Sequence, residues 1–275
     1  MRTSRRTLRP PTPKVARTMT LAQGSFLFAM AAIGSALNAV AGGGSFFTFP
    51  ALVLIGIPPI VANATSTVAL WPGSLSSATA YRKDVARHRG LLLPLAVASL
   101  CGGSLGAWLL LRTGDTTFAK LVPWLLLTAT VLFAVSRPLV RWLASDTGPG
   151  GPGNPQRSSW GLVLAQLAIA VYGGYFGGGM GILMLAGLAV FGLTDIHAMN
   201  GIKSVLGTVI NGVAVVLFVA AGAVRWPEAL VMVGGAVLGG HVGATLARRV
   251  AAVQVQRGVV AAGLVLTGYF FWRQG

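Results

Sequence analysis

The feature that most constrains this chain is a succession of apolar segments, most of them about 20 residues long, between residues 21 and 272. A helix of about 20 apolar residues is long enough to cross a hydrocarbon core about 30 Å thick. Only 9% of the 275 residues are charged and 54% are hydrophobic, and the mean hydropathy is +0.74. Soluble domains carry about a quarter charged residues. We therefore predict an all-α polytopic membrane protein.

Two of the apolar segments are too short to cross a membrane, and each of them follows three consecutive glycines. Segment 45–56 follows glycines 42–44, and segment 180–192 follows glycines 177–179. Short, glycine-interrupted segments at corresponding places in two halves of a chain indicate the binding site of a transporter. We predict about eight spanning helices and these two broken or re-entrant segments. The segments are 21–41, 45–56, 60–81, 90–111, 117–136, 160–176, 180–192, 196–222, 228–247 and 256–272.

The two halves of the chain are related by an internal repeat. Residues 102–109 and 239–246 share the pattern Gly-Gly-x-x-Gly-Ala-x-Leu. The same offset places Asn63 on Asn200 and Arg112 on Arg249. The resulting division is a basic cytoplasmic tail at 1–19, a first membrane repeat at 20–143, a Gly/Pro-rich linker at 144–159 and a second membrane repeat at 160–275.

The net charge of +16 and the pI near 11.8 do not indicate nucleic-acid binding, because the basic residues lie in the tail and at the ends of apolar segments. Such residues set membrane topology and contact anionic lipid. Placing the tail, the 82–89 cluster and the 137–157 cluster in the cytoplasm requires an even number of crossings between them. That favours four crossings per half, halves of equal orientation and cytoplasmic termini. The membrane we expect is the bacterial inner membrane. Arg248, Arg249 and Arg257 then fall outside, so an inverted five-plus-five arrangement stays open.

No catalytic pattern occurs in the sequence. Motifs for zinc proteases, serine hydrolases and phosphate-binding loops are all missing. The single Cys101 excludes a disulfide framework and a cysteine metal cluster. The five acidic residues lie at segment ends or in loops. We therefore predict a protein that is not an enzyme and that has no cofactor and no bound metal.

One polar helix face carries a charge inside an apolar segment. Asn200, Lys203, Ser204, Gly207 and Asn211 follow a helical spacing within 196–222. A lysine in a membrane segment costs about 2.5–3.5 kcal/mol on insertion scales. Since no acidic residue shares this face, a small anion is the natural partner of the lysine. In the alternative, the lysine reaches the membrane surface and the polar faces make helix contacts in a non-transporting scaffold or accessory subunit.

The first repeat has a corresponding polar face at 63–81, so the two faces together predict one anion site. Serine and threonine hydroxyls also join helices to each other in membranes, which is the alternative for each of them. The glycine triplets would supply backbone N–H groups and hinges for alternating access. Further expected partners are membrane lipid and a coupling ion; the oligomeric state stays open. The predicted site residues are Lys203, Asn200, Asn63, Thr65, Ser66, Asn211 and Ser204, with Gly42, Gly43, Gly44, Gly177, Gly178 and Gly179 as backbone or hinge positions.

The chain resembles the TauE/SafE family of sulfite exporters from about residue 20 to residue 272. The resemblance lies in glycines 42–44 with the Ser-Phe-Phe-Thr-Phe-Pro that follows, in Pro58-Pro59-x-x-Ala62-Asn63-Ala64-Thr65-Ser66, in Tyr172-Gly-Gly-Tyr-Phe-Gly177-Gly178-Gly179, and in Trp226-Pro227. It implies a permease that exports sulfite, a sulfonate or a related sulfur-containing anion, driven by an ion gradient or the membrane potential. The chain differs from the family pattern at Asn200-Gly201-Ile202, where the family often has Ala-Thr-Ser.

Overall fold

The computed structural model of the chain describes residues 19–41, 43–80, 85, 89–145, 159–193, 195–246 and 252–273. Gly42, nearly all of the basic tail and most of the predicted linker lie outside these ranges. Within them the structure contains ten helices and no strand, which confirms the all-α prediction. The helices are α1 (Leu21–Ala41), α2 (Ser45–Leu54), α3 (Pro59–Ala80), α5 (Arg89–Arg112), α6 (Asp115–Ser145), α7 (Ser159–Tyr175), α8 (Met180–Val190), α9 (Ile196–Ala220), α10 (Trp226–Leu246) and α11 (Ala252–Trp272).

Four stretches of the described helices are long and apolar enough to cross a membrane. They are 21–38 in α1, 90–112 in α5, 115–135 in α6 and 198–220 in α9. Helices α2, α7, α8 and α10 contribute shorter apolar stretches. The sequence predicted about eight spanning helices, and the spans beyond these four stay a prediction.

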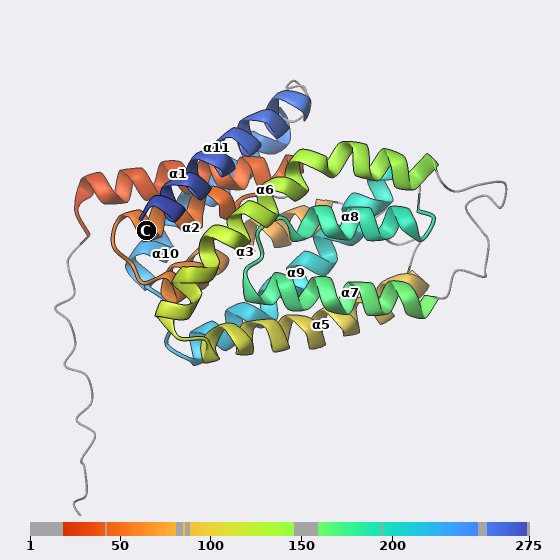
Figure 1. The fold of residues 1–275 in the computed structure, drawn as a ribbon, viewed down its shortest axis with the longest axis horizontal. Coiled ribbons are helices and arrows are strands. Elements are labelled where there is room, and N and C mark those ends of the chain that lie inside the picture. Colours follow the sequence, from red (N-terminus) through yellow and green to blue (C-terminus); the bar gives the residue numbers. More distant parts are fainter. Residues whose placement is uncertain are drawn as a thin grey trace, which may run out of the picture.

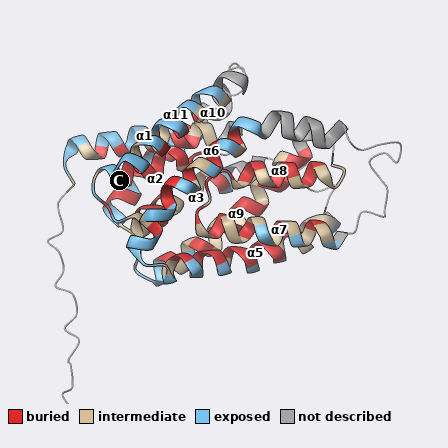
Figure 2. Cartoon of the chain, viewed as in Figure 1, coloured by how far each residue is buried: buried red, intermediate tan, exposed pale blue. Residues whose placement is uncertain are grey.

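The outer surface of the helix bundle is apolar, as a lipid-facing surface must be. On α5 the side chains of Leu93, Val97 and Leu100 are 70%, 54% and 50% exposed. Their spacing places them on one helix face, and exposed positions follow the outward sides of α1, α5 and α10 (Figure 2). Because lipid tails are as apolar as leucine, such a face costs nothing in a bilayer.

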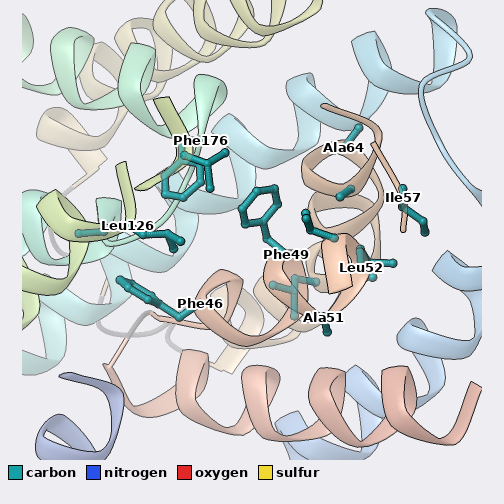
Figure 3. Packing of buried hydrophobic residues seen from close by; sticks show 14 of the residues in the cluster. Phe46, Phe49, Ala51, Leu52, Ile57, Ala64, Leu126 and Phe176 are labelled. Atoms are coloured by element: carbon teal, nitrogen blue, oxygen red, sulfur yellow. The ribbon is translucent and has the colours of Figure 1, made fainter. Parts of the chain in front are cut away.

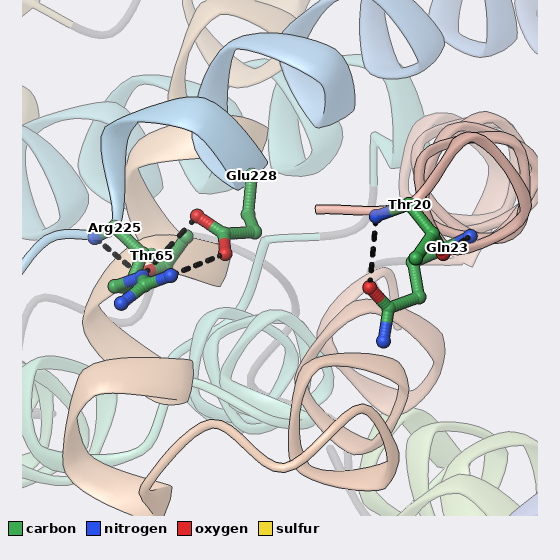
Figure 4. Close-up of polar contacts among 5 residues, drawn as sticks. All are labelled: Thr20, Gln23, Thr65, Arg225 and Glu228. Carbon is green, nitrogen blue, oxygen red and sulfur yellow. Dashed lines mark hydrogen bonds and ion pairs between the residues drawn. The ribbon is translucent and has the colours of Figure 1, made fainter. Parts of the chain in front are cut away.

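The ends of the helices follow from local sequence. Thr20 and Gln23 form a reciprocal cap before α1: the Thr20 N–H donates to Gln23 Oε1 at 3.1 Å, and the Gln23 N–H donates to Thr20 Oγ1 at 3.2 Å (Figure 4). Pro59 occupies the first position of α3, where its missing N–H has no cost. Helices α2 and α8 start directly after Gly44 and Gly179.

The two repeats exchange helices in their packing. Helix α1 of the first repeat lies along α10 of the second, and α7 of the second lies along α5 of the first. Glycines form both contacts: a Cβ atom on Gly239 would overlap the carbonyl of Ala32, and a Cβ atom on Gly106 would overlap the carbonyl of Val171. Small residues allow this close approach of backbones, which stabilises helix association inside membranes. We call these two contacts the glycine seams.

The repeats are inverted relative to each other. Helices α6 and α11 occupy corresponding places in the two repeats, and they pack antiparallel (Figure 1). Trp124 packs on Phe271, with ring centroids 5.1 Å apart, whereas Gln256 donates its Nε2–H to the carbonyl of Phe133 at 2.6 Å. Equal orientation of the halves, which the positions of the basic clusters favoured, is therefore wrong, and the inverted alternative holds. The beginning of α1 and the end of α11 lie at the same end of the molecule (Figure 1).

The core between the repeats is built on phenylalanines. Phe49 of α2 is fully buried and packs against Phe118 of α6, Phe176 after α7 and Phe270 of α11, with centroids 6.3, 5.7 and 6.4 Å apart. Figure 3 shows Phe49 with Phe176 on one side and with Leu52 of α2, Ile57 of the following turn and Ala64 of α3 on the other. Aromatic pairs of this kind contribute about 0.5–1.5 kcal/mol each beyond the burial of their area. The short helix α2 is thus fixed by neighbours from both repeats.

Candidate functional site

A cavity of about 70 Å³ lies where α3 of the first repeat meets α8 and α9 of the second. One water needs about 10–15 Å³ by this measure, so the cavity has room for a small ion and its contacts. The repeat is visible in its walls: Thr67, Leu70 and Ser74 of α3 occupy the positions that Ser204, Gly207 and Asn211 occupy on α9. Asn38, Ser45, Gly177, Met180, Gly181, Met184, Asn200 and Lys203 complete the lining.

Lys203 brings the positive charge to this cavity. The residue is only 9% exposed, and its Nζ donates to Asn200 Oδ1 at 3.0 Å. It lies about 10 Å along α9 from Ile196, inside the stretch that is apolar enough to span. Within the described ranges the structure contains one ion pair, between Arg225 and Glu228. In this part of the chain Lys203 therefore has no carboxylate as an ion-pair partner. An anion in the cavity would be the counter-charge of Lys203.

The remaining lining is partly apolar and partly polar. Leu70, Met180 and Met184 supply apolar side chains, and Asn38 and Ser45 add an amide and a hydroxyl from α1 and α2. Sequence reasoning did not place Asn38, Ser45 or the two methionines in the site. Asn38 could have been identified from the sequence, because burying an amide in an otherwise apolar membrane segment costs free energy unless the amide has a partner or a function.

The glycine triplets shape the turns that lead into α2 and α8. Gly177 and Gly179 adopt φ values of +79° and +78°, a region that other residues avoid. The Tyr172 hydroxyl donates to the carbonyl of Gly178 at 2.6 Å, which fixes the turn before α8. Gly177 lines the cavity, whereas Gly43 and Gly44 are buried against Phe133 and against α1.

The three first-repeat candidates lie outside the cavity lining. Asn63 donates its Nδ2–H to the carbonyl of Tyr175 at 3.1 Å. Ser66 shares a hydrogen bond with Thr48, with the two hydroxyl oxygens 2.6 Å apart. Thr65 Oγ1 accepts the backbone N–H of Arg225 at 3.0 Å (Figure 4). The structure thus brings Lys203, Asn200, Ser204, Asn211 and Gly177 together around one cavity and places Asn63, Thr65 and Ser66 in contacts between helices.

An ion pair fastens the connection between α9 and α10 near Thr65. The Arg225 guanidinium donates to both oxygens of the buried Glu228 carboxylate, at 2.9 and 3.3 Å (Figure 4). The hydrogen bond to Glu228 raises the pKa of Arg225 above its usual value, so the guanidinium stays charged at every physiological pH. Together with the Thr65 contact, this pair attaches the start of α10 to α3.

No group of three or more His, Cys, Asp or Glu residues with metal-binding proximity occurs in the part of the chain that the structure describes. The polar groups of the cavity are an ammonium, amides and hydroxyls, all of which can donate hydrogen bonds.

Comparison with known proteins agrees with this architecture. The sequence profile of the sulfite exporter TauE/SafE family matches residues 26–270. A "Probable membrane transporter protein" of Haemophilus influenzae is 28% identical over 255 residues, covering 91% of this chain and 95% of that protein. "Probable membrane transporter protein ORF9" of a Sinorhizobium species is 30% identical, covering 81% and 82%. "Probable membrane transporter protein YfcA" of Escherichia coli strain K12 is 29% identical, covering 80% and 79%.

No solved structure matches the chain. The family profile covers most of the chain, and it includes both glycine seams and every residue around the cavity. The chain therefore belongs to the sulfite exporter TauE/SafE family and is a multi-pass membrane transporter.

Proposed function

We propose that this protein is a secondary transporter that exports a small sulfur-containing anion, sulfite or a sulfonate, across the bacterial inner membrane. The observation that carries the proposal is the position of Lys203, an ammonium group in a cavity of hydrogen-bond donors inside a membrane-spanning helix. An anion of this class has three oxygens at one end, which suits Lys203, Ser204 and Asn211 as donors. The family supports sulfur anions as the substrate class.

The inverted repeats supply a route for alternating access. In transporters built from inverted repeats, one bundle rocks against the other around a binding site near the bilayer midplane. Here α3 and α9, which correspond to each other in the two repeats, both line the cavity. Trp71 of α3 donates its indole N–H to the carbonyl of Thr208 at 3.2 Å, which places a large side chain where the two helices cross.

The charge of the cavity favours a singly charged substrate. Lys203 is the one cationic residue of the described lining, and no acidic residue lies there. A second negative charge would stay unpaired in a low-dielectric site, at a cost of several kcal/mol. The apolar side chains of Met180 and Met184 in the lining would accept the carbon end of a sulfonate, since methionine side chains adapt to irregular shapes.

We expect purified protein in proteoliposomes to transport methanesulfonate and hydrogensulfite at least about tenfold faster than sulfate. Sulfite flux should fall as the pH is raised, because the doubly charged form then replaces hydrogensulfite. The measurement is uptake of each anion, including thiosulfate, with protein-free vesicles as the control. Equal rates for sulfate and methanesulfonate would overturn the charge argument. No flux of any anion, with the protein shown to be folded, would overturn anion transport.

The repeat provides a matched pair of substitutions for the site. Asn200→Ala should weaken anion binding roughly tenfold, because Lys203 loses the acceptor that orients it. Asn63→Ala removes the corresponding amide of the first repeat, leaves the carbonyl of Tyr175 without its donor, and should cost about 1–3 kcal/mol of stability without changing affinity. Binding isotherms and thermal unfolding in detergent separate the two effects. A loss of affinity in Asn63→Ala equal to that in Asn200→Ala would extend the site to the first-repeat residues.

A further inference from the structure

A second cavity, larger and apolar, lies at the end of the molecule where α11 ends. Its volume is about 350 Å³, within the range of about 300–1,000 Å³ that is usual for binding sites of small organic molecules. The turn between α2 and α3 forms one side with Ile57 and Pro58, and α6 and α11 form the other with Val122 and Phe270. Arg273 is the only charged residue of the described lining.

The cavity lies at the depth of lipid headgroups. Helix α6 begins at Asp115 and α11 ends at Trp272, so the lining residues lie within about 10 Å of the helix ends. Trp124 and Trp272 each lie two residues along the chain from a lining residue, Val122 and Phe270, and are 60% and 80% exposed. Exposed tryptophans of membrane proteins concentrate at the interface between hydrocarbon and water. These positions therefore place the cavity near the depth of lipid phosphates.

The guanidinium of Arg273 is available to bind a ligand at this end of the cavity. It is exposed, and across the described ranges the structure gives its guanidinium no ion pair. The carboxylate of Asp115, the first residue of α6, accepts the backbone N–H of Ile60 at 3.4 Å and so caps the start of α3. The positive end of α3 partly offsets the charge of Asp115.

We propose that this cavity is a binding site for an anionic phospholipid, with one acyl chain against Ile57, Val122 and Phe270 and the phosphate on Arg273. An apolar space with one arginine at its headgroup end matches a lipid in both polarity and charge. A cation at the membrane surface attracts anionic headgroups, and an apolar cavity, which holds water poorly, accepts an apolar ligand such as a hydrocarbon chain. The site is separate from the cavity at Lys203 and does not depend on the transported substrate.

The test is native mass spectrometry of the full-length protein after delipidation in detergent. Phosphatidylglycerol and phosphatidylcholine with identical acyl chains are titrated onto the wild type and onto Arg273→Gln, Arg273→Lys and Ala119→Trp. Ala119 lines the cavity, and a tryptophan there would fill it. Lys120→Gln is the matched control, because Lys120 is an exposed cation on the same helix outside the lining.

We expect the wild type, Arg273→Lys and Lys120→Gln to retain one phosphatidylglycerol. Arg273→Gln should bind it at least about fivefold more weakly, and Ala119→Trp should lose both lipids while its unfolding temperature stays close to that of the wild type. Equal retention of the two lipids by the wild type would overturn the role of charge. An equal loss in Lys120→Gln and Arg273→Gln, or full retention by folded Ala119→Trp, would overturn the site.

Discussion

Lys203→Met is expected to abolish saturable anion transport and, at the same time, to stabilise the protein without substrate. The ammonium group of Lys203 is buried in a membrane-spanning helix and has a neutral amide as its partner. Removing such a charge relieves a cost of about 2.5–3.5 kcal/mol on insertion scales. The same substitution removes the one cation of the described cavity lining, so affinity for a singly charged anion should fall at least about 100-fold.

Flux into proteoliposomes and thermal unfolding in detergent, with and without sulfite or methanesulfonate, measure both effects. Lys203→Arg keeps the charge and should keep measurable transport, while Lys120→Gln controls for the loss of a cation elsewhere. In the wild type the anion should raise the unfolding temperature, and in Lys203→Met it should not. Transport that survives in Lys203→Met would leave the protein a transporter and remove the proposed site. A lower unfolding temperature in this variant would show that Lys203 is a structural residue.

Gly239→Ala is expected to prevent stable folding, because a single methyl group has no room in the seam between α1 and α10. Its Cβ would overlap the backbone of Ala32, and overpacking of this kind costs about 1–3 kcal/mol or more. Gly102→Ala tests the corresponding position of the other seam, where the Cβ would lie 2.6 Å from the carbonyl oxygen of Leu167. Gly268→Ala on α11 is the control, because nothing lies within 4 Å of its Cβ position.

Yield after membrane extraction and unfolding temperature report the outcome. Gly268→Ala should equal or exceed the wild type, since alanine favours a helix over glycine by up to about 1 kcal/mol. Gly239→Ala and Gly102→Ala should both fall well below it. If all three variants unfold at the same temperature, the seams do not require glycine at these positions, and the close packing of α1 on α10 is wrong.

The sequence predicted the helices well, and it also placed four polar residues of α9 on one helix face. Both predictions depend on local sequence alone. Apolar segments of spanning length are determined by composition alone, and nearly all of their limits agree with helix limits to within a few residues. On α9 the spacing of Asn200, Lys203, Ser204 and Asn211 places them on one face whatever surrounds the helix, and these residues line the cavity.

The wall from α3 was harder to predict, because neighbouring residues of a helix point in directions about 100° apart. Thr67 and Ser74 line the cavity, whereas Ser66 and Thr65 face α2 and the loop before α10. All four are small polar residues, so their types do not distinguish them. The rotation of α3 is set by its neighbours, such as Thr48 of α2 and the backbone of Arg225, and these contacts are not visible in sequence.

The predicted equal orientation of the two halves was wrong for a related reason. The short helix α2 runs back toward the end from which α1 came, so the beginning of α1 and the end of α3 lie at opposite ends of the molecule (Figure 1). In the sequence the basic tail precedes α1 and the 82–89 cluster follows α3, and the described helices between them do not return the chain to its starting end. A rule that counts positive charges per loop assumes that every apolar segment either crosses or does not. A short apolar segment such as α2, which runs only part of the way through the membrane, changes the number of crossings that such a rule counts.

The glycine seams also determine when the molecule can be completed during synthesis. Helix α1 ends at Ala41 and its partner α10 begins at Trp226. At about 5–20 residues per second, α1 leaves the ribosome on the order of 10–40 s before α10 exists. During that interval the face of α1 around Phe28 and Ala32 has only lipid or the insertion machinery as a neighbour. A nascent chain that stops after the first repeat therefore exposes an unpaired helix face to membrane quality control, even though its own repeat is fully translated.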